Sequence, residues 1–338
     1  MSRTIIQKDS VCGVVGYGSW ATALVKILLD NGNEVRWHVR NPEVREHLVK
    51  HRSNPKYLSQ VHFPTAGLTV GGDIGEVVGE SEVVIFAVPS AFLAATLEPL
   101  APDALEGKFV VSAIKGIVPD GYLTVAEWFN RRYDVPFDRI GVVTGPCHAE
   151  EVALERLSYL TMVCKEPEAA AALGAKFVND YIRVTASCDI YGVEYAVVLK
   201  NIYAIAVGIA HGLGYGDNFL AVLISNAALE MEHFLSSTFE TRRNVCASAY
   251  LGDLLVTCYS QFSRNRTFGV MIGKGYSVRN AQMEMNMVAE GYYGADCIHR
   301  LQARFGIEMP IAEAVYGILY EGRRPADGLR GELGWVRL

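Results

Sequence analysis

The stretch from residue 10 to residue 40 constrains the fold of this chain more than any other segment. An apolar run at 11–15 leads into a turn that contains Gly16 and Gly18, and Ala21 supplies a third small residue. Apolar residues then recur at helical spacing until a polar turn, after which a second strand is expected. A strand, a glycine turn, a helix and a strand within about 30 residues form the pattern that binds dinucleotides.

Each small residue of this turn has a physical role in such a site. Gly16 lets the chain reverse sharply, Gly18 lets the backbone approach a pyrophosphate, and Ala21 keeps the helix close to the strand. The amino end of the helix directs N–H groups and a positive dipole end at the phosphates. Ser19 and Trp20 lie at the turn, where both could touch a cofactor. The alternative interpretation is an ordinary tight turn between a strand and a helix.

Composition and charge indicate an intracellular globular protein. The 338 residues, half of them apolar and a fifth charged, are enough for two domains with sizeable cores. A net charge of -6 provides no general basic field for nucleic acid. Seven scattered cysteines without CxxC or Cys/His metal spacing predict reduced thiols in the cytoplasm and no metal site. We expect no signal peptide, and no membrane span because no stretch approaches about 18 uninterrupted apolar residues.

Alternating strands and helices predict an α/β fold. After the first unit, the polar region 41–64 suits a short helix and a loop. Further strands are expected at 68–70, 81–88, 108–113, 140–144 and 159–164, with helices at 73–78, 91–100, 122–133 and 168–179. This alternation is typical of a doubly wound, mostly parallel sheet. We therefore predict an N-terminal doubly wound Rossmann-type domain at residues 1–188.

The pattern changes near residue 187, after which long helical periodicities replace strands. Helices are expected at 189–210, 218–236, 243–260, 265–274, 277–285, 295–305 and 310–321. The tail after Pro325 is expected to be loosely held. The sequence therefore predicts an all-α C-terminal domain at residues 189–338.

Polar or turn residues follow three of the expected strands. Ligands of open α/β sheets bind beyond the carboxyl ends of the strands, and Pro89-Ser90, Lys115-Gly116 and the turn at 145–150 stand there. Lys115 could contact a substrate anion, a carbonyl oxygen or the cofactor. An isolated lysine at such a place is otherwise a solvated surface residue.

Lys200 lies within an apolar helical stretch. The positions that share its helical face, namely 193, 196, 197, 204 and 207, are all apolar. Burial of a lysine is costly unless it has a partner or faces a ligand, and burial lowers its pKa toward neutrality. Lys200 is therefore a candidate general acid, and Asn201 beside it could fix a carbonyl or hydroxyl group. The alternative, a lysine on a polar helix face, fits these neighbours poorly.

A third candidate site lies at 251–266. Ser263-Arg264-Asn265 precedes a helix, so a hydroxyl, a guanidinium fork and an amide meet at a helix N-terminus, as in a phosphate clamp. A basic turn taken alone is more often simply exposed. Asp253 and Thr257, one helical turn apart, would share a face.

These segments together resemble the NAD(P)-dependent glycerol-3-phosphate dehydrogenases of the soluble bacterial type. The resemblance extends over roughly residues 10–320 in the same order. The matching segments are GYGSWATAL (16–24), FAVPS (86–90), IKG (114–116), GPCHAEEV (145–152), LKNIYAIAVGIAHGLGYGDN (199–218), LGDLLVTC (251–258), SRNRTFG (263–269) and AEG (289–291).

The resemblance implies a role for each matching position. Lys200 would exchange the proton at the substrate oxygen, Asp253 and Thr257 would orient it or the substrate, and Lys115 would complete the catalytic group. The implied substrate-binding residues are Lys115, Gly145, Cys147, Lys200, Asn201, Asp253, Ser263, Arg264 and Asn265. The implied cofactor-binding residues are Gly16, Gly18, Ser19, Trp20, Ala21, Arg40, Pro89, Lys115, Ala149, Arg264, Val288 and Glu290.

The chain departs from the family pattern at a few places. Cys147 and His148 replace a hydroxyl residue and an aromatic residue, and a thiol is a poorer hydrogen-bond donor. His148 could itself be catalytic, although Lys200 is the better candidate. Ser225-Asn226 replaces the usual Thr-Arg, and the stretch at 291–296 lacks the usual threonine. These changes affect substrate tuning rather than the class of reaction.

The end of the second strand bears on which nicotinamide cofactor binds. NAD sites usually carry an acid there, whereas this chain has His38-Val39-Arg40-Asn41, with Glu43 further on. Arg40 could stack on adenine or meet a 2′-phosphate. We predict that NADP is accepted, with NAD as the alternative.

The resemblance implies reversible hydride transfer between NAD(P)H and dihydroxyacetone phosphate. The product, sn-glycerol 3-phosphate, would serve phospholipid synthesis, and the family implies a homodimer. One alternative is a related dehydrogenase of the β-hydroxyacid type that acts on another small substrate, but the segment SRNR favours a phosphorylated one. The other is a non-catalytic NAD(P)-binding sensor, which the joint presence of Lys115, Lys200 and Asp253 disfavours.

Overall fold

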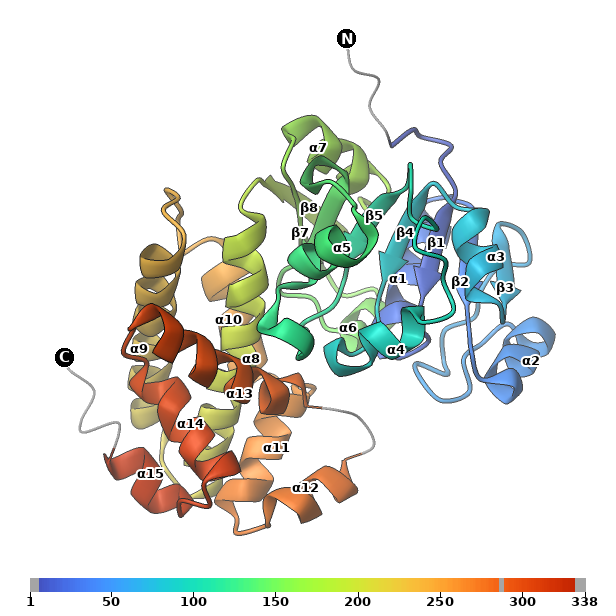
Figure 1. Ribbon diagram of the computed structural model, residues 1–338. Helices are drawn as coiled ribbons and strands as arrows, with labels where there is room; N and C mark the ends of the chain where they lie inside the picture. Colours follow the sequence, from blue (N-terminus) through green and yellow to red (C-terminus); the bar gives the residue numbers. More distant parts are fainter. Residues whose placement is uncertain (1–5, 286–288, 332–338) are drawn as a thin grey trace. The chain divides into compact units, whose positions relative to one another are not determined.

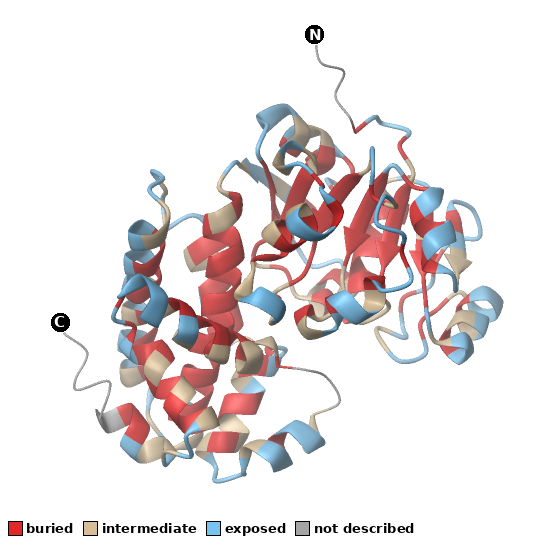
Figure 2. Cartoon of the chain, viewed as in Figure 1, coloured by how far each residue is buried: buried red, intermediate tan, exposed pale blue. Residues whose placement is uncertain are grey.

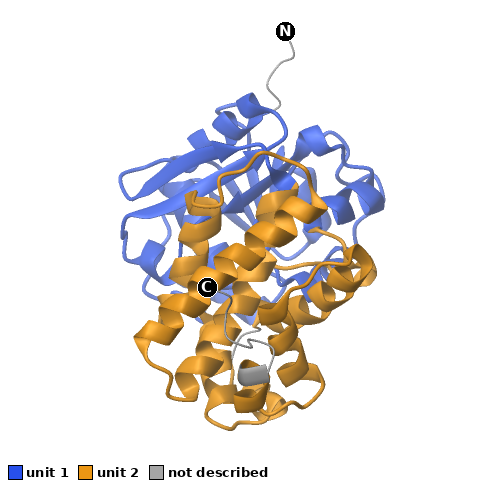
Figure 3. Ribbon diagram, turned by 90° about the vertical axis from the view of Figure 1, so that its left-hand side faces the viewer, with its two compact units in different colours: residues 1–114, 125–190 blue, residues 115–124, 191–338 orange. Residues whose placement is uncertain are grey.

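The computed structural model describes residues 6–285 and 289–331. It divides into two compact units, which Figure 3 colours separately. The first comprises residues 1–114 and 125–190, and the second comprises residues 115–124 and 191–338. Residues 115–124 therefore pack with the helical unit although the chain on both sides of them belongs to the sheet unit.

An eight-stranded sheet forms the centre of the first unit (Figure 1). Its order is β3-β2-β1-β4-β5-β6-β7-β8, and all neighbours are parallel except β6 and β7. The strands are β1 Cys12–Val15, β2 Val35–His38, β3 Leu68–Gly71, β4 Val83–Phe86, β5 Phe109–Ser112, β6 Ile140–Thr144, β7 Ser158–Cys164 and β8 Ile182–Ser187. The predicted doubly wound sheet is confirmed.

The last strand, β8, was not predicted from the sequence. It pairs with β7 in parallel, but only Ile182 among its residues is fully buried, so the segment carries little apolar signal. Pairing with β7 over six positions, rather than an apolar pattern of its own, makes this segment a strand.

The helices of the first unit are α1 Ser19–Asp30, α2 Pro42–His51, α3 Ile74–Gly79, α4 Leu93–Leu97, α5 Val125–Tyr133, α6 Ala149–Ala153 and α7 Pro167–Ala175, with 3-10 turns at Ser90–Phe92 and Phe137–Arg139. Three of them, α4, α5 and α7, are shorter than the sequence suggested. The predicted helix at 122–133 begins only at Val125, because Gly121 and Tyr122 have positive φ angles. The short α6 was not predicted.

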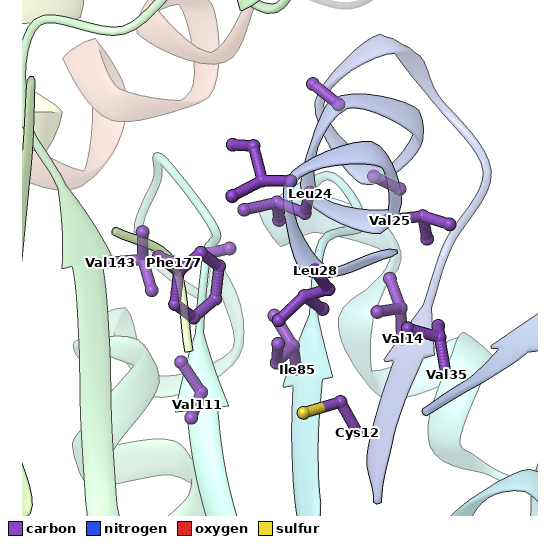
Figure 4. Close-up of a cluster of buried hydrophobic side chains, with 14 of the residues drawn as sticks. Cys12, Val14, Leu24, Val25, Leu28, Val35, Ile85, Val111, Val143 and Phe177 are labelled. Atoms are coloured by element: carbon purple, nitrogen blue, oxygen red, sulfur yellow. The ribbon is translucent and has the colours of Figure 1, made fainter. Parts of the chain in front are cut away.

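Helix α1 and the central strands share one apolar core (Figure 4). Leu24 and Leu28 of α1 lie with Val14 of β1 and Ile85 of β4 in this cluster, all fully buried. Burial of each such leucine stabilises the fold by roughly 1.5–3 kcal/mol. This packing fixes the direction in which the amino end of α1 leaves the sheet.

The second unit is helical. Its helices are α8 Ile190–Gly212, α9 Asp217–Thr238, α10 Asp253–Tyr259, α11 Arg264–Gly273, α12 Val278–Glu284, α13 Glu290–Phe305, α14 Pro310–Tyr320 and α15 Pro325–Gly331, with a 3-10 turn at Asp120–Tyr122 and a π-helical turn at Ser248–Gly252. Among its described residues there is no strand beyond an isolated bridge between Val118 and Leu123.

Three predictions for this unit were wrong in detail. The helix expected at 243–260 begins at Ser248, as a π turn that continues into α10. Helix α13 begins at Glu290 rather than 295. The tail after Pro325 was expected to be loosely held, but its described part, up to residue 331, forms α15 and contains the buried Leu329.

Helix α8 is the central helix of the second unit. Every residue from 192 to 210 is buried (Figure 2). Its length and apolar composition would also suit a membrane-spanning helix, but the most apolar 18-residue window is 100% buried within the protein. A helix that is apolar on all sides is expected at the centre of a core.

Helices α8 and α11 meet through four glycines. A Cβ atom at Gly208 would lie 2.2 Å from the carbonyl oxygen of Arg266, and one at Gly269 would lie 2.2 Å from that of Ile205. Gly212 and Gly273, one turn further along each helix, make the same kind of contact. Only glycine permits such a close backbone approach. The two helices that carry Lys200 and the Ser263–Asn265 segment are therefore held backbone to backbone.

Candidate functional site

The glycine turn of the first unit has the geometry of a phosphate-binding turn. Gly16 has a φ of 116°, and a Cβ atom there would lie 2.5 Å from the carbonyl oxygen of Ala87, so only glycine fits. Gly18 has an ordinary φ of -70°, and a Cβ atom there would meet nothing within 4 Å. The space beside Gly18, at the amino end of α1, is thus open to a ligand phosphate.

The turn also lies at the correct place in the sheet. It follows β1, which lies between β2 and β4, where the strand order reverses direction. Ligands of doubly wound sheets bind at this switch point. Ser19 and Trp20 begin α1 directly after the turn, and the fully buried Ala21 packs α1 against the sheet.

Two side chains that the sequence did not single out hold the turn in place. Trp37 on β2 donates its indole N–H to the carbonyl oxygen of Gly16 at 2.6 Å. Asn54, fully buried, donates from Nδ2 to the carbonyl oxygen of Tyr17 and to Oγ1 of Thr22, both at 2.9 Å. Trp37 lies on the second strand that the sequence predicts, but that pattern does not show its contact with Gly16. Asn54 lies in a polar loop, where nothing local marks it.

Several ionisable side chains lie near the end of β2. His38 is buried, and burial lowers the pKa of its imidazole, with Arg40 and Arg45 nearby acting in the same direction. Arg40 itself is exposed. The nearby carboxylate, Asp73, accepts hydrogen bonds from the N–H groups of Gly75 and Glu76 as the cap of α3. The exposed cation Arg40 and the capping carboxylate Asp73 therefore both lie near the end of β2.

The turn after β6 carries three residues of the implied binding set. Gly145 has a φ of 116°, and a Cβ atom there would lie 2.7 Å from the carbonyl oxygen of Tyr159, so the turn requires glycine. Cys147 is buried within the apolar core cluster, and Ala149 begins α6. With the Cys147 thiol in the core, we expect the backbone of this turn to make any ligand contact. Pro89 precedes the 3-10 turn that follows β4.

The second unit holds a buried ion pair. Nζ of Lys200 on α8 lies 2.5 Å from Oδ1 of Asp253, the first residue of α10, and only 3% and 2% of the two side chains are exposed. Thr257 donates its hydroxyl to the backbone carbonyl of Asp253 at 2.6 Å. Thr257 therefore supports the first turn of α10 and, through it, the position of Asp253.

Burial sets the acidity of Lys200. Desolvation lowers the pKa of its ammonium group to about 8, the charge of Asp253 opposes this shift, and the charge of Lys115 adds to it. A lysine with such a pKa can both give and take a proton near neutral pH. The burial of Lys200 that the helical spacing suggested is present, and its role as a proton-exchanging group stays a prediction.

Asn201, Asn265 and Lys115 are joined by hydrogen bonds. Nδ2 of Asn201 donates to the carbonyl oxygen of Lys115 at 2.8 Å, and Oδ1 of Asn201 accepts from Nδ2 of Asn265 at 2.9 Å. Oδ1 of Asn265 accepts from the backbone N–H of Gly291 at 2.9 Å. Residues from four separate segments therefore meet around Lys200.

The Ser263–Asn265 segment begins α11, as predicted. Ser263 is the N-cap, and its hydroxyl accepts a hydrogen bond from the N–H of Arg266 at 3.3 Å. Arg264, the first residue of the helix, is exposed, whereas Asn265 is buried. Glu290 begins α13, and Val288 lies outside the described residues.

Within residues 6–285 and 289–331, no three or more His, Cys, Asp or Glu side chains lie together in a way that suits a metal ion.

Two family models match the chain. One, described as NAD-dependent glycerol-3-phosphate dehydrogenase N-terminus, matches residues 11–170. The other, described as NAD-dependent glycerol-3-phosphate dehydrogenase C-terminus, matches residues 189–330.

Curated proteins and solved structures agree with these models. The chain is 37% identical over 311 residues to a glycerol-3-phosphate dehydrogenase (NAD(P)+) from Chlorobium limicola, an alignment that spans 92% of this chain and 93% of that protein. It is 36% identical over 324 residues to a protein of the same name from Agathobacter rectalis, with 95% and 94% covered. A crystal structure of glycerol-3-phosphate dehydrogenase from Coxiella burnetii matches with a TM-score of 0.88 and 28% identity, over 95% of this chain and 98% of that chain.

Proposed function

Because the chain belongs to the family of NAD-dependent glycerol-3-phosphate dehydrogenases, we propose that it catalyses the reversible reduction of dihydroxyacetone phosphate to sn-glycerol 3-phosphate. The observation that carries this proposal is the buried pair of Lys200 and Asp253, with Lys115 close enough to lower the pKa of Lys200. Such a pair provides a proton-exchanging group of the acidity that carbonyl reduction at neutral pH requires.

The cofactor is a nicotinamide dinucleotide, and the first unit fits it. The open space at Gly18 and the amino end of α1 suit its pyrophosphate, and the glycine at position 16 is needed for the turn. We assign Ser19, Trp20 and Arg40 to the same ligand. Pro89, Ala149, Arg264, Val288 and Glu290 complete the proposed set, together with Lys115. When bound, the cofactor supplies or takes up the hydride.

Lys200 handles the proton. In reduction, its ammonium group gives a proton to the substrate oxygen that becomes the hydroxyl group of the product. Asp253 keeps the charged form of Lys200 accessible in a buried environment. Without such a partner, a buried lysine would lose its proton and stay a neutral amine. In oxidation, the neutral amine takes the proton back.

The substrate phosphate is held at the start of α11. Arg264 is exposed at the first position of this helix, where a guanidinium fork and the helix dipole both favour an anion. Ser263 and Lys115 assist, and the backbone of Gly145 and Cys147 contributes to the same ligand. Because the phosphate is held, the carbonyl group of the substrate is kept in a fixed position for the reaction.

We propose that NADP is accepted, with Arg40 at the 2′-phosphate. The observation behind this is the exposed cation at the end of β2 and the use of Asp73 as a helix cap. Comparing kcat/KM for NADPH and NADH tests the proposal, and a hundredfold preference for NADH would refute it. We further infer that the protein is a cytoplasmic homodimer, and light scattering can test its oligomeric state. We also infer that its product enters glycerophospholipid synthesis, which metabolic complementation can test.

One assay tests the proposed reaction. Purified protein is mixed with NADPH or NADH and either dihydroxyacetone phosphate or a panel of unphosphorylated ketones and keto acids, and loss of reduced cofactor is followed. Turnover only with dihydroxyacetone phosphate is expected. Preference for an unphosphorylated compound would indicate a related dehydrogenase, and cofactor binding without turnover would indicate a sensor.

A further inference from the structure

Two consecutive carbonyl oxygens of the glycine turn, those of Tyr17 and Gly18, are bound from within the protein. Asn54 donates from Nδ2 to the carbonyl oxygen of Tyr17 at 2.9 Å. The hydroxyl group and the backbone N–H of Thr22 both donate to the carbonyl oxygen of Gly18, each at 2.9 Å. Nδ2 of Asn54 also donates to that hydroxyl group at 2.9 Å, so one side-chain amide acts on both carbonyl groups.

A bound carbonyl oxygen also fixes the direction of the N–H group in the same peptide. In a planar trans peptide the two groups point in opposite directions. The peptide that carries the carbonyl oxygen of Tyr17 carries the N–H of Gly18, and the next peptide carries the N–H of Ser19. Because Asn54 and Thr22 bind the two oxygens, both N–H groups are directed away from these side chains.

We propose that Asn54 is a positioning residue for the cofactor, which holds the peptides of the glycine turn so that the N–H groups of Gly18 and Ser19 face the pyrophosphate. This inference rests on the proposed function, because the pyrophosphate is that of the nicotinamide dinucleotide. Asn54 acts through the backbone of the turn rather than by touching the cofactor. The space beside Gly18, where a Cβ atom would meet nothing within 4 Å, receives the phosphates.

The hydrogen bonds of the Asn54 side chain determine which way its amide group points. Oδ1 accepts from the backbone N–H of Lys56 at 3.1 Å and from that of Tyr57 at 3.3 Å. A backbone N–H can only donate and the carbonyl oxygen of Tyr17 can only accept, so an amide turned by 180° would lose all three bonds. Asn54 is fully buried, and a bond lost here is not replaced by bulk water.

The turn needs this support because Gly18 has no side chain. Without a Cβ atom, the peptide between Tyr17 and Gly18 meets little steric resistance to reversal. A reversed peptide would direct the carbonyl oxygen of Tyr17 at the phosphates, so a partial negative charge would replace a donor. Trp37 holds the preceding peptide through the carbonyl oxygen of Gly16. Asn54 therefore controls the peptide that is free to reverse.

Titration of cofactor binding tests the role of Asn54. In Asn54→Ala we expect Kd to rise about ten- to a hundredfold, because a charge-assisted hydrogen bond from the turn is lost. The factor should be the same for NADPH and NADH, since both contain the pyrophosphate, and kcat at saturating cofactor should stay within about threefold. Asn31→Ala is the matched control. Asn31 also donates from Nδ2 to two carbonyl oxygens at 2.9 Å, those of Lys176 and Val178, but at the carboxyl end of α1.

An isosteric substitution separates orientation from packing. Asn54→Asp keeps the shape of the side chain but replaces the donor at Nδ2 with an oxygen, which repels the carbonyl oxygen of Tyr17. Kd for both cofactors should therefore rise at least as much as in Asn54→Ala. If Asn54 only fills space, Asn54→Asp will bind both cofactors as the wild type does, and the proposal is overturned.

Trp37→Phe carries the test to the neighbouring peptide if both Asn54 variants fail to fold. It removes the donor to the carbonyl oxygen of Gly16 and keeps an aromatic ring in the core. Kd for both cofactors should rise about three- to tenfold, as for loss of one neutral hydrogen bond that orients the turn. Unchanged binding in this variant would contradict control of the turn through its carbonyl oxygens.

Nuclear magnetic resonance of the backbone N–H groups provides a readout that needs no turnover. Binding of NADPH should move the proton resonances of Gly18 and Ser19 downfield in the wild type and in Asn31→Ala, as when an N–H donates to phosphate. In Asn54→Ala the shift at Gly18 should be lost. An unmoved Gly18 resonance in the wild type would overturn the proposal.

The comparison of cofactors and of turnover keeps the two proposals apart. Weaker binding of NADPH alone in Asn54→Ala would mean that Asn54 acts on the 2′-phosphate end, which would also overturn the inference. If both cofactors bind as expected but dihydroxyacetone phosphate is not reduced, the proposed function fails and the role of Asn54 stands. If the wild type binds neither cofactor, both proposals fail.

Discussion

The two candidate sites of this protein are built in different ways. The nucleotide turn of the first unit is contiguous, and its defining features are backbone conformation at Gly16 and open space at Gly18. The candidate catalytic cluster of the second unit brings together residues near 115, 200, 253 and 265, and side chains define it. A site defined by backbone conformation can be recognised from a short sequence motif. A site defined by side chains from distant segments can be recognised only when the folded structure is known.

Removal of Lys200 should have the largest effect and most directly tests the side-chain site. Lys200→Ala is expected to lower kcat on the order of 10²–10⁴-fold, as for loss of a general acid. It should also destabilise the fold by about 3–5 kcal/mol, because Asp253 is left buried without its partner. Denaturant unfolding and steady-state kinetics measure the two effects.

A paired variant separates these two effects. Lys200→Met combined with Asp253→Asn removes the uncompensated charge, so stability should return while activity does not. The exposed Lys50→Ala is the matched control on the first unit. If Lys200→Ala retains activity within about tenfold of the wild type, the assignment of the proton-exchanging group is wrong.

Loss of Arg264 should act on substrate binding. Arg264→Ala is expected to raise KM for dihydroxyacetone phosphate about ten- to a hundredfold, because a charge-assisted hydrogen bond to phosphate is lost. The exposed Arg279→Ala on α12 is the control. An unchanged KM would count against the phosphate clamp.

The direction of the reaction should determine its pH dependence. The pKa of Lys200 is lowered to about 8 by burial, and reduction needs its charged form. The rate of reduction should therefore fall about tenfold per pH unit above this value, whereas oxidation should rise as pH approaches it. Initial rates in both directions across the range check this, and parallel profiles would contradict the role of Lys200.

The two glycines of the nucleotide turn should respond differently to alanine. Gly16→Ala forces a side chain into a positive φ and against the carbonyl oxygen of Ala87, so a loss of about 3 kcal/mol in the free energy of unfolding is expected. Gly18→Ala should change Tm by no more than about 2 °C. It should instead raise KM for the cofactor about tenfold, because its methyl group occupies the space beside α1. Equal stability losses in both variants would contradict this contrast.

Replacement of Arg40 should have the smallest effect. Arg40 is exposed, so its contact with a 2′-phosphate is screened by solvent, and Arg40→Ala should lower the ratio of kcat/KM for NADPH over NADH only about three- to tenfold. Lys50→Ala serves again as the control. An unchanged ratio would assign cofactor choice to other residues.

The fold was predictable where sequence pattern and burial coincide. The buried strands β1 and β4 and the long helices α8 and α9 appear as apolar runs or periodicities, and the resemblance to the family is confirmed by both family models. Strand β8 was missed because its pairing with β7, rather than its own residues, makes it a strand. The π turn at Ser248–Gly252 likewise has no periodicity that a helical pattern could predict.

The candidate site was predictable residue by residue but not in its connections. Lys200 was identified because its helical neighbours are apolar, and Asp253 lies 2.5 Å from it in the structure. The support that Trp37 and Asn54 provide to the nucleotide turn depends on contacts across the fold, so no local pattern marks it. The same is true of the bond from Asn201 to the backbone of Lys115.

The segment 115–124 also limits how this protein can be divided. The chain passes between the two units after residues 114, 124 and 190, so a single cut cannot yield both units complete. A fragment that begins at residue 189 lacks Lys115, and a fragment that ends at residue 188 contains it without the helices that hold it. Domain exchange with this protein therefore requires that residues 115–124 move together with the helical unit. A split or circularly permuted form has to attach this segment to the helical part, so that Lys115 stays with it.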